Sequence, residues 1–409
     1  MKFGVFYELQ IPRPWDEESE YRLFQQTLDQ IELADKLGYD NIWAVEHHFL
    51  EEYSHCSAPE VLLAAASQRT KNIRIGHSVA QLTTSPPQRV AERVSTLDLV
   101  SHGRVEFGMG EAGSLTELEP FGRTKEEKRE VWEEALKALV PMMTESATEF
   151  HGKYFDFPLR NVLPKPRQKP HPPLWVACTQ LDTIAYAGQL GIGALGFQFV
   201  GPEMAQAWVH AYYNNFTKRR APIAGYQPNP GIALVSMFMC SETDELAVQR
   251  SDGATFFEFA IRYYSSSNGD RGKPGEVNLW EQYQAWLAER QAEGKGLPRG
   301  ATSGLVGSPD KLRRRLNKFQ ESNIDQVLLL VQAGQNKHED ICASLELFAR
   351  EVMPEFHDRE PEHLKWKEGV LSGDIELEEI DLSPHYIKRF DQYNQEMGRG
   401  KRSLEDATG

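Results

Sequence analysis

The sequence predicts a (β/α)8 barrel, and two observations lead to this fold class. Short apolar runs, typical of strands buried on both faces of a parallel sheet, recur eight times and alternate with amphipathic helical segments. Helix N-cap residues and C-terminal glycines mark the ends of these segments and indicate short loops between them. The chain has 409 residues, more than the roughly 250 that such a barrel needs, so we expect insertions and a C-terminal extension.

The strands are predicted from β-branched and apolar runs that turn residues delimit. We expect strands at residues 2–7, 42–45, 73–79, 104–108, 174–177, 194–198, 232–239 and 326–332. Between them, apolar residues recur at helical spacing. We expect helices at residues 24–37, 59–69, 86–97, 124–142, 182–190, 202–219, 279–293 and 339–351, and another that begins near residue 243. Residues 85–88 and 124–127 both have the spacing of a capping box.

Three segments depart from the alternation of strands and helices. Residues 148–173 are rich in aromatic residues and prolines, which indicates a hairpin-like excursion. Residues 263–304 are too long for an ordinary joint and are predicted to form a lid over the site. Residues 357–409 read as an acidic tail or arm. We therefore expect one barrel domain over residues 1–356, followed by this tail.

The composition narrows the class of function before any motif is considered. The 60 acidic and 45 basic residues give a formal charge of −15 without a basic stripe, which argues against nucleic acid and anionic membranes as partners. The four cysteines are far apart and fit a reducing cytosol. The first residues lack the features of a signal peptide, and no run is long enough to span a bilayer. We expect a cytoplasmic protein that acts on a small molecule.

An acid and two adjacent histidines, Glu46, His47 and His48, follow the second predicted strand directly. Successive side chains of a strand point to opposite faces, so His47 faces one way and its two neighbours face the other. In a barrel, active sites are built at the carboxyl ends of the strands. The triplet is therefore predicted to contain a functional histidine. A structural histidine and a metal hydrolase remain as alternatives, although alternating faces make the triplet a poor chelate.

Several short motifs stand in the order found in a known family, and they span nearly all of residues 1–356. They are MKFGVF, EHHF, GRVEFGMGEAG, FG followed by Arg129, PPLWVACTQLDTIAYAG, LLLVQAG and SLELFAREVMPEF. Each motif alone is weak, but their shared order along an independently predicted barrel is specific. In this respect the chain resembles the bacterial luciferase-like flavin monooxygenases.

The resemblance implies a commonly dimeric barrel that holds reduced FMN at the carboxyl rim and uses dioxygen to oxygenate a small organic substrate. His47, the first histidine of EHHF, matches the family's catalytic position, where it would accept or relay a proton with a pKa near the working pH. We expect a homodimer through rim helices, including the Ala-rich helix 59–69. The resemblance does not identify the substrate. It also does not decide whether a separate flavin reductase supplies the reduced flavin.

The resemblance also implies two groups that hold the FMN phosphate. Arg129 matches an arginine that contacts the phosphate in the family. The turn after the fifth strand offers free backbone N–H groups and hydroxyls to an anion. The residues of this turn that we expect at the cofactor are Thr179, Gln180, Leu181 and Thr183.

The turn after the fourth predicted strand departs from the family pattern. Luciferase carries a cysteine and then a phosphate-binding arginine there, whereas this chain has Gly110 and Glu111. A carboxylate beside a phosphate would repel it, so we expect Glu111 to turn away or to contact another group. Without that arginine, Arg129 is expected to contribute more of the binding energy of the phosphate. The absence of the cysteine means that the resemblance does not imply light emission.

Other positions are expected to surround the flavin ring or the substrate. Ser78 and Val79 lie where relatives have a non-prolyl cis peptide near the ring, and Gly110 would allow close approach of the backbone. We expect Gln81 and Gln198 beside the flavin ring. Further candidates for the substrate pocket are Tyr7, Tyr154 and Gln332.

Two alternatives concern the chemistry of the cofactor. The same barrel could serve a deazaflavin-dependent hydride-transfer enzyme, which would not consume oxygen. A catalytically silent flavin-binding protein is the alternative from another class, and the presence of His47 argues against it. Titration with both cofactors distinguishes the first alternative, and oxygen-dependent turnover that survives His47→Ala would contradict the assignment of His47 as the base.

Overall fold

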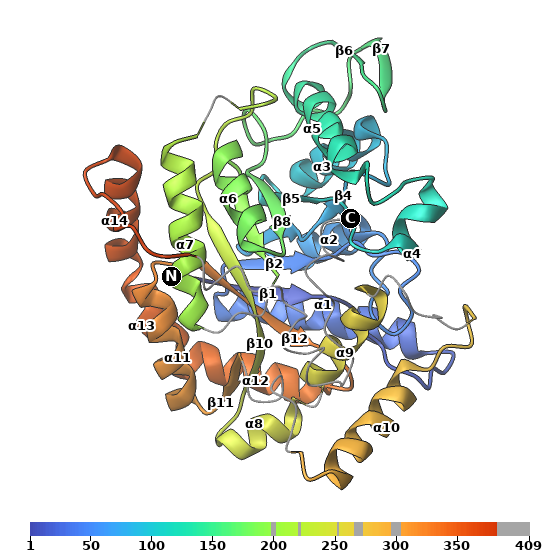
Figure 1. The fold of residues 1–409 in the computed structure, drawn as a ribbon, viewed down its shortest axis with the longest axis vertical. Helices are drawn as coiled ribbons and strands as arrows, with labels where there is room; N and C mark the ends of the chain where they lie inside the picture. The colour runs from blue at the N-terminus through green and yellow to red at the C-terminus, as the bar shows by residue number, and fades with distance from the viewer. Residues whose placement is uncertain (198–201, 220–221, 252, 266–272, 296–303, 383–409) are drawn as a thin grey trace.

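Eight parallel strands form a closed barrel in the computed structural model, which describes residues 1–197, 202–219, 222–251, 253–265, 273–295 and 304–382 (Figure 1). The strands follow one another around the barrel in chain order, and the last pairs with the first. They are β1 (Lys2–Tyr7), β2 (Asn41–Ala44), β3 (Arg74–His77), β5 (Val105–Gly110), β8 (Leu174–Cys178), β9 (Gly193–Gly196), β10 (Ile232–Cys240) and β12 (Gln326–Gln332). The predicted (β/α)8 barrel is confirmed, and its strands lie where the apolar runs placed them.

Aromatic rings fill the inside of the barrel. Trp43 of β2 and Trp175 of β8 meet edge to face, with ring centroids 5.6 Å apart. The Trp43 ring depends on Gly76 in the neighbouring strand, because a Cβ at that position would lie 2.2 Å from the ring. The interior is therefore a packed core, and a ligand site has to lie beyond the ends of the strands.

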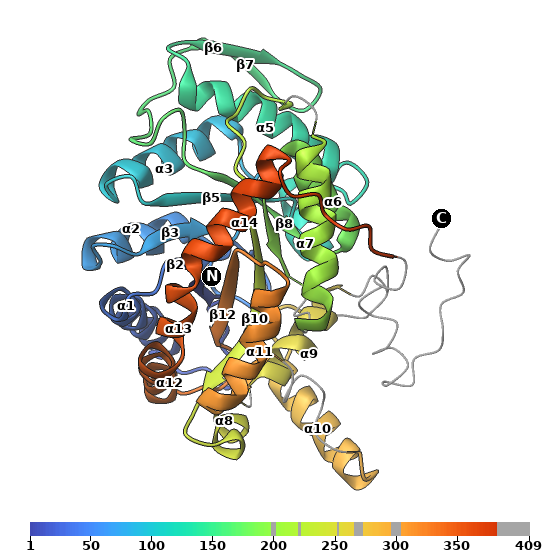
Figure 2. The same cartoon turned by 90° about the vertical axis from the view of Figure 1, so that its left-hand side faces the viewer.

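Helices cover the outside of the barrel (Figures 1 and 2). They are α1 (Ser19–Leu37), α2 (Pro59–Arg69), α3 (Pro87–Val100), α5 (Lys128–Thr144), α6 (Leu181–Leu190), α7 (Pro202–Thr217), α11 (Pro309–Glu321) and α12 (His338–Glu351). Gly38 and Gly191 end α1 and α6 in the left-handed conformation, at φ 84° and 73°. In the part of the chain that the structure describes, no helix is long and apolar enough to cross a membrane.

The two predicted capping boxes have different outcomes. The Thr124 backbone N–H donates to Glu127 Oε1 at 3.0 Å, and the Glu127 N–H donates to Thr124 Oγ1 at 3.4 Å, so the reciprocal bonds form just before α5. The box at residues 85–88 is wrong, because α3 begins at Pro87 without a side-chain cap bond. Pro86 precedes another proline, which disfavours a helical conformation, and it stays extended at ψ 134°.

The excursion and the long insertion contain short elements of their own. In the excursion, β6 (Thr148–His151) and β7 (Asp156–Arg160) pair as the predicted antiparallel hairpin. Between β10 and β12 lie α8 (Asp244–Arg250), α9 (Gly253–Ser265), α10 (Leu279–Ala292) and the short strand β11 (Leu305–Gly307). The helix predicted at 279–293 is α10, which lies at the periphery (Figure 2), whereas α9 was not predicted. Residues 266–272 and 296–303 of the insertion lie outside the described residues.

Two further helices, α13 (Met353–Asp358) and α14 (Glu360–Ser372), lie across the end of the barrel at which the strands begin (Figure 2). Asp325, immediately before β12, holds α14 through His363 Nε2 at 2.9 Å and Lys367 Nζ at 2.8 Å. The first part of the predicted acidic tail is therefore a packed helix, with Val370 buried. Residues 383–409 of that tail lie outside the described residues. Because α13 and α14 cover this end, the opposite end is the place for a site.

Candidate functional site

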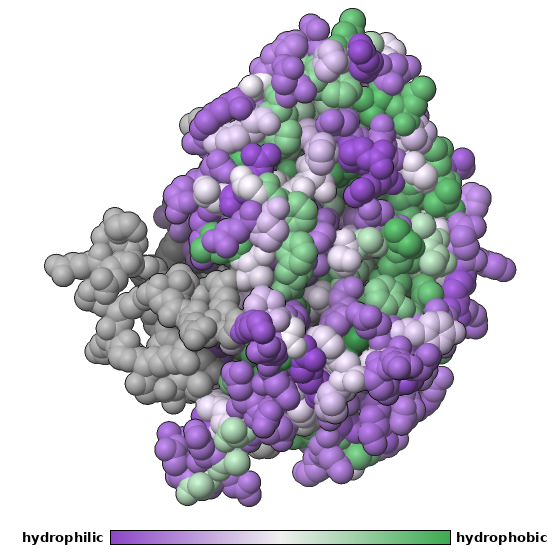
Figure 3. All heavy atoms as spheres, turned by 90° about the vertical axis from the view of Figure 1, so that its right-hand side faces the viewer, coloured by the Kyte–Doolittle hydropathy of each residue, from purple (hydrophilic) through white to green (hydrophobic). Residues whose placement is uncertain are grey.

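A cavity of about 470 Å³ lies at the carboxyl ends of the barrel strands. Residues that follow β1, β2, β3, β5, β8 and β9 form its walls, together with the starts of α5 and α6 and one face of α9. Figure 3 shows the side of the molecule opposite to α13 and α14, where apolar and polar side chains are interspersed. The predicted site residues that line the cavity are His47, Ser78, Gln81, Gly110, Arg129, Thr179, Gln180 and Thr183.

His47 lies between two buried carboxylates. Its Nδ1 is 2.9 Å from Glu117 Oε1, and its Nε2 is 3.2 Å from Glu8 Oε1. Glu8 directly follows β1, and Glu117 belongs to the short helix α4 (Leu115–Leu118) in the loop after β5. The Tyr53 ring meets the imidazole edge to face, with centroids 5.2 Å apart. Both ring nitrogens face acceptors, an arrangement that suits an imidazolium because it donates from both.

The two carboxylates determine the charge of His47. Burial lowers the pKa of His47, but the negative charges of Glu117 and Glu8 outweigh burial and raise this pKa from 6.5 to about 10. Burial also raises the pKa of Glu8, whereas at Glu117 the opposing effect of His47 is stronger and the pKa is lowered. His47 is therefore protonated at neutral pH, unlike the expected group with a pKa near the working pH. Two buried acids cause the difference, and both lie outside the EHHF motif.

Gln81 links His47 to the pair formed by its neighbours. His48 Nε2 is 3.0 Å from Glu46 Oε1, so the two residues expected to face away from His47 pair with each other. Gln81 Nε2 donates to the Glu46 carbonyl oxygen at 2.9 Å and to Glu117 Oε1 at 2.7 Å. Gln81, predicted as a ring neighbour, therefore lines the cavity and also positions the acid that faces His47.

Two cations from the start of α5 line the cavity at another wall. Lys128 Nζ is 3.2 Å from Glu111 Oε2, and Arg129 forms an ion pair with the other oxygen of the same carboxylate. The Arg129 guanidinium also lies over the Tyr186 ring, 4.9 Å from its centroid. Arg129 is thus in the cavity as predicted, but Glu111 lies on the cations. This is a specific form of the expected contact with another group.

The turn before α6 adds hydrogen-bonding groups to the cavity. The Gln180 N–H donates to Thr183 Oγ1 at 3.1 Å, and Thr183 Oγ1 donates to the Gln180 carbonyl oxygen at 2.7 Å. Thr179, Gln180 and Thr183 line the cavity. Leu181 does not, because its side chain is buried in the core at the first turn of α6. The start of a helix favours an anion in general, and the use of this turn for the phosphate stays a prediction.

The joint between β3 and β4 (Ala80–Gln81) explains two glycines of β5. The Ser78–Val79 peptide is cis, as the resemblance predicted, and both residues line the cavity. A Cβ at Gly108 would lie 2.0 Å from the His77 carbonyl oxygen, and one at Gly110 would lie 2.2 Å from Val79 Cγ2. Both glycines therefore admit the chain's own 77–79 segment. Gly110 and Gly113 also line the cavity, and the close approach of a flavin to their backbone stays a prediction.

Several residues of the cavity were not predicted. Glu8 stands at a strand end, the same signal that identified His47, so it was accessible to sequence reasoning. Glu117 and Lys128 lie in a loop and at a helix start, where no local pattern distinguishes them from solvated residues. Phe257 and Ile261 of α9 also line the cavity. Tyr264, which belongs to the predicted lid, also lines the cavity. The wall that α9 forms begins earlier in the chain than the predicted lid, which starts at residue 263.

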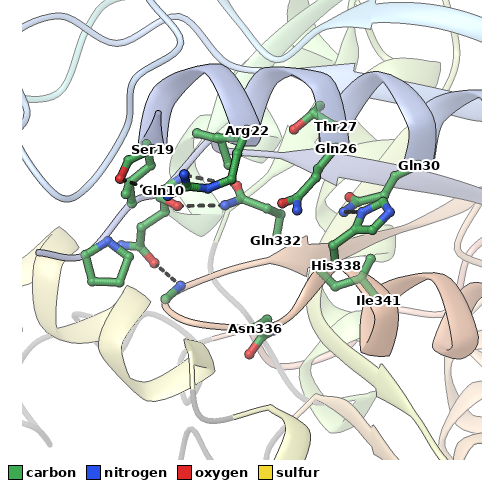
Figure 4. A pocket seen from close by; sticks show the side chains of 14 residues that line it. Gln10, Ser19, Arg22, Gln26, Thr27, Gln30, Gln332, Asn336, His338 and Ile341 are labelled. Atoms are coloured by element: carbon green, nitrogen blue, oxygen red, sulfur yellow. Dashed lines mark hydrogen bonds between the residues drawn. The ribbon is translucent and has the colours of Figure 1, made fainter. Parts of the chain in front are cut away.

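The remaining pocket candidates lie elsewhere. Gln332 lines a separate polar pocket of about 170 Å³ between β12 and α1 (Figure 4). There its amide accepts from the Gln10 N–H at 2.9 Å and donates to the Gln10 carbonyl oxygen at 2.6 Å. Tyr7 is fully buried, and Tyr154 in the excursion donates to Glu130 Oε2 at 2.9 Å. Gln198 lies outside the described residues. Gln332, Tyr154 and Tyr7 therefore do not line the cavity that contains His47.

The chemistry of the cavity fits a flavin phosphate and ring. Its volume falls within the range of about 300–1,000 Å³ that small-molecule sites occupy. Cations and the start of α6 offer an anion seat, and apolar side chains such as Val79, Val176 and Phe197 offer contacts to a flat ring. Among the residues that the structure describes, no group of three or more His, Cys, Asp or Glu is arranged to hold a metal ion.

Comparison with known proteins places this geometry in a family. The sequence profile described as luciferase-like monooxygenase matches residues 1–326. The oxygenase component of a flavin-dependent trigonelline monooxygenase from Acinetobacter baylyi is 20% identical over 88% of this chain and 96% of its own length. An F420-dependent glucose-6-phosphate dehydrogenase from Amycolatopsis mediterranei is 28% identical over 42% of this chain and 53% of its own length.

The solved structures show the same fold. The monooxygenase RslO1 from Streptomyces bottropensis superposes with a TM-score of 0.69 and 25% identity, covering 87% of this chain and 100% of that structure. The chain spans about half the length of several curated relatives that it matches, 49% and 54% in two cases.

Proposed function

The chain belongs to the luciferase-like monooxygenase family, and from this premise we propose that it uses reduced FMN and dioxygen to oxygenate a small organic substrate. The observation that carries the proposal is one cavity with two chemically different walls. At one wall, Lys128, Arg129 and the start of α6 suit a phosphate; at the other, His47 stands beside Glu8 and Glu117.

The residues of the cavity have distinct roles in this proposal. When bound, reduced FMN supplies the electrons with which dioxygen is activated. Arg129, Lys128 and the turn at 179–183 would hold its phosphate, and Gly110 and the 78–79 segment would contact its ring. His47 holds a proton at the site, and Gln81 keeps Glu117 beside it. The aromatic and aliphatic side chains of α9 keep water from the reacting groups.

The test is a comparison of cofactors. Anaerobic titration with FMN and with a deazaflavin, followed by flavin or deazaflavin absorbance, is expected to show saturable binding of reduced FMN. Mixing the complex with oxygen and a panel of small organic substrates is expected to give substrate-dependent oxygen uptake. Binding of the deazaflavin alone, without oxygen uptake, contradicts the proposal.

Deazaflavin-dependent hydride transfer is the second candidate function, and the F420-dependent relative favours it. A protein that binds FMN but shows no uptake with any substrate would fit the silent flavin-binding alternative. The oxygenase-component relative supports the further proposal that a separate reductase supplies the reduced flavin.

We also propose a homodimer that forms through α2 and α3. These helices pack against each other and expose apolar side chains: Val61 is 67% exposed, Leu99 43% and Val100 40%. Val61→Glu is therefore expected to convert a dimer to a monomer, because dimerisation would bury the new charge. Sedimentation velocity measures this shift. Leu364→Glu, at a half-exposed position on α14, is the control expected to remain dimeric. A monomeric wild-type protein at micromolar concentration refutes the proposal.

A further inference from the structure

The Glu111 carboxylate lies on the two cations that line the cavity. Its Oε2 is 3.2 Å from Lys128 Nζ, and its Oε1 pairs with the Arg129 guanidinium. Among the described residues that line the cavity, Lys128 and Arg129 are the only lysine and arginine. The groups that suit an anionic ligand thus already hold an anionic side chain.

A carboxylate and a phosphate compete for such donors because both present oxygen acceptors to the same N–H groups. A phosphate monoester carries about −1.5 to −2 charges at pH 7. Lys128 and Arg129 together carry two positive charges, which match that phosphate when Glu111 is absent. With Glu111 in place, only one net positive charge remains.

The geometry allows the Glu111 side chain to leave without movement of its backbone. Thr83 Oγ1 donates to the Glu111 carbonyl oxygen at 2.9 Å, and Lys128 Nζ donates to the Ala112 carbonyl oxygen at 3.2 Å. These bonds fix the turn, whereas the carboxylate is held by its two ion pairs. The Glu111 side chain is 16% exposed and lines the cavity, so it borders both solvent and the cavity space when it leaves the cations.

We propose that Glu111 occupies the seat of the cofactor phosphate and is displaced when the cofactor binds, an inference that rests on the proposed use of FMN. Each binding event then breaks the Glu111 ion pairs before the phosphate forms its own. Glu111 thereby weakens the hold on the phosphate and makes the flavin an exchangeable cosubstrate. A loosely held flavin matches a supply of reduced flavin from another protein.

The test compares FMN with riboflavin, which has the ring but no phosphate. Flavin fluorescence quenching gives both dissociation constants for the wild type, Glu111→Gln and Glu111→Ala. We expect either substitution to tighten FMN binding by about tenfold, a typical scale for one charge interaction in a partly buried site. Riboflavin affinity is expected to change less than twofold. Glu130→Gln is the matched control, because Glu130 lies on α5 beside Lys128 and Arg129 but pairs with Lys153 in the excursion.

The outcomes separate this inference from the proposed function. Tighter FMN binding with unchanged riboflavin binding supports the displacement of Glu111. Wild-type binding of FMN with no gain in either Glu111 variant, or an equal gain in Glu130→Gln, overturns the inference and leaves the proposed cofactor intact. Failure of the wild type to bind FMN or riboflavin overturns the proposed function, and this inference with it. Circular dichroism of both Glu111 variants verifies that they are folded.

Discussion

Replacing His47 by glutamine is expected to lower substrate-dependent oxygen uptake by about 10²- to 10⁴-fold, the contribution of a positioned acid–base group. Glutamine keeps a hydrogen-bond donor for Glu117, but it cannot hold or release a proton. FMN binding is expected to change little, because Lys128, Arg129 and the turn at 179–183 remain. Oxygen-electrode measurements with reduced FMN and the substrate found by screening provide the rate.

His151→Gln is the matched control for this prediction. His151 also pairs with a carboxylate, at 2.6 Å from Asp156 Oδ1, but it lies in the exposed hairpin outside the cavity. Its variant is expected to keep the wild-type rate. Wild-type oxygen uptake in His47→Gln contradicts the proposed role of His47.

The pH dependence gives an independent readout of the same residue. The folded pKa of His47 is raised from 6.5 to about 10, so the protonated form contributes its full stabilisation below about 6.5, and this contribution is lost as the pH rises through about 10. The alkaline limb of the activity profile is expected near the same pH. Glu117→Gln removes one of the two acids and is expected to move that limb to lower pH. If the alkaline limb of the activity profile stays at the same pH in Glu117→Gln, a group other than His47 causes that limb.

Replacing Asp325 by alanine is expected to destabilise the chain by about 3–5 kcal/mol, the cost of removing one partner from a buried ion pair. Asp325 accepts from His363 and Lys367 of α14, from the Tyr213 hydroxyl at 2.6 Å and from the Ile232 N–H at 2.8 Å. Alanine leaves all four donors without this acceptor and detaches α14 from the barrel. Urea unfolding followed by circular dichroism measures the change.

The stability that Asp325 contributes depends on pH in the opposite direction to that of His47. Burial raises the pKa of Asp325, but Lys367 and His363 outweigh burial and hold the pKa well below its usual range. The stabilisation is therefore present above the unfolded value of about 3.9 and is lost as the pH falls through the depressed folded value. Asp310→Ala, at an exposed aspartate paired with Arg313, is the control expected to cost less than about 1 kcal/mol. A similar loss in both variants contradicts the role of Asp325.

Local sequence patterns were sufficient for the barrel and for one part of the cavity. Buried apolar runs identified the strands, and glycine signals identified helix ends such as Gly38. The strand-end position predicted that one histidine of the pair would face the rim, and the resemblance to the family selected His47. The strand-to-helix turn at 179–183 offered groups for an anion, and the resemblance assigned the phosphate to it. The strands, the helix ends and the turn depend on neighbours within a few residues, which periodicity and capping report directly.

The tertiary structure alone decided the partners of these residues. His47 and Glu117 are separated by 69 intervening positions, and only closure of the barrel brings them to 2.9 Å. Glu111 was expected to turn away or to contact another group, and only the folded turn after β5 shows which: it places the carboxylate on the cations of α5. Asp325 and α14 likewise meet across the end of the barrel.

The sequence by itself determined the order of strands and helices and the end of each strand at which functional side chains gather. The tertiary structure decided the charge of His47 and the side chain that lies on the proposed phosphate-binding cations. The physical reason is that local geometry depends on neighbours along the chain, whereas electrostatic energy depends on distance through space. Folding sets the distance from His47 to Glu8 and Glu117, and from Glu111 to Lys128 and Arg129, and no local pattern encodes those distances.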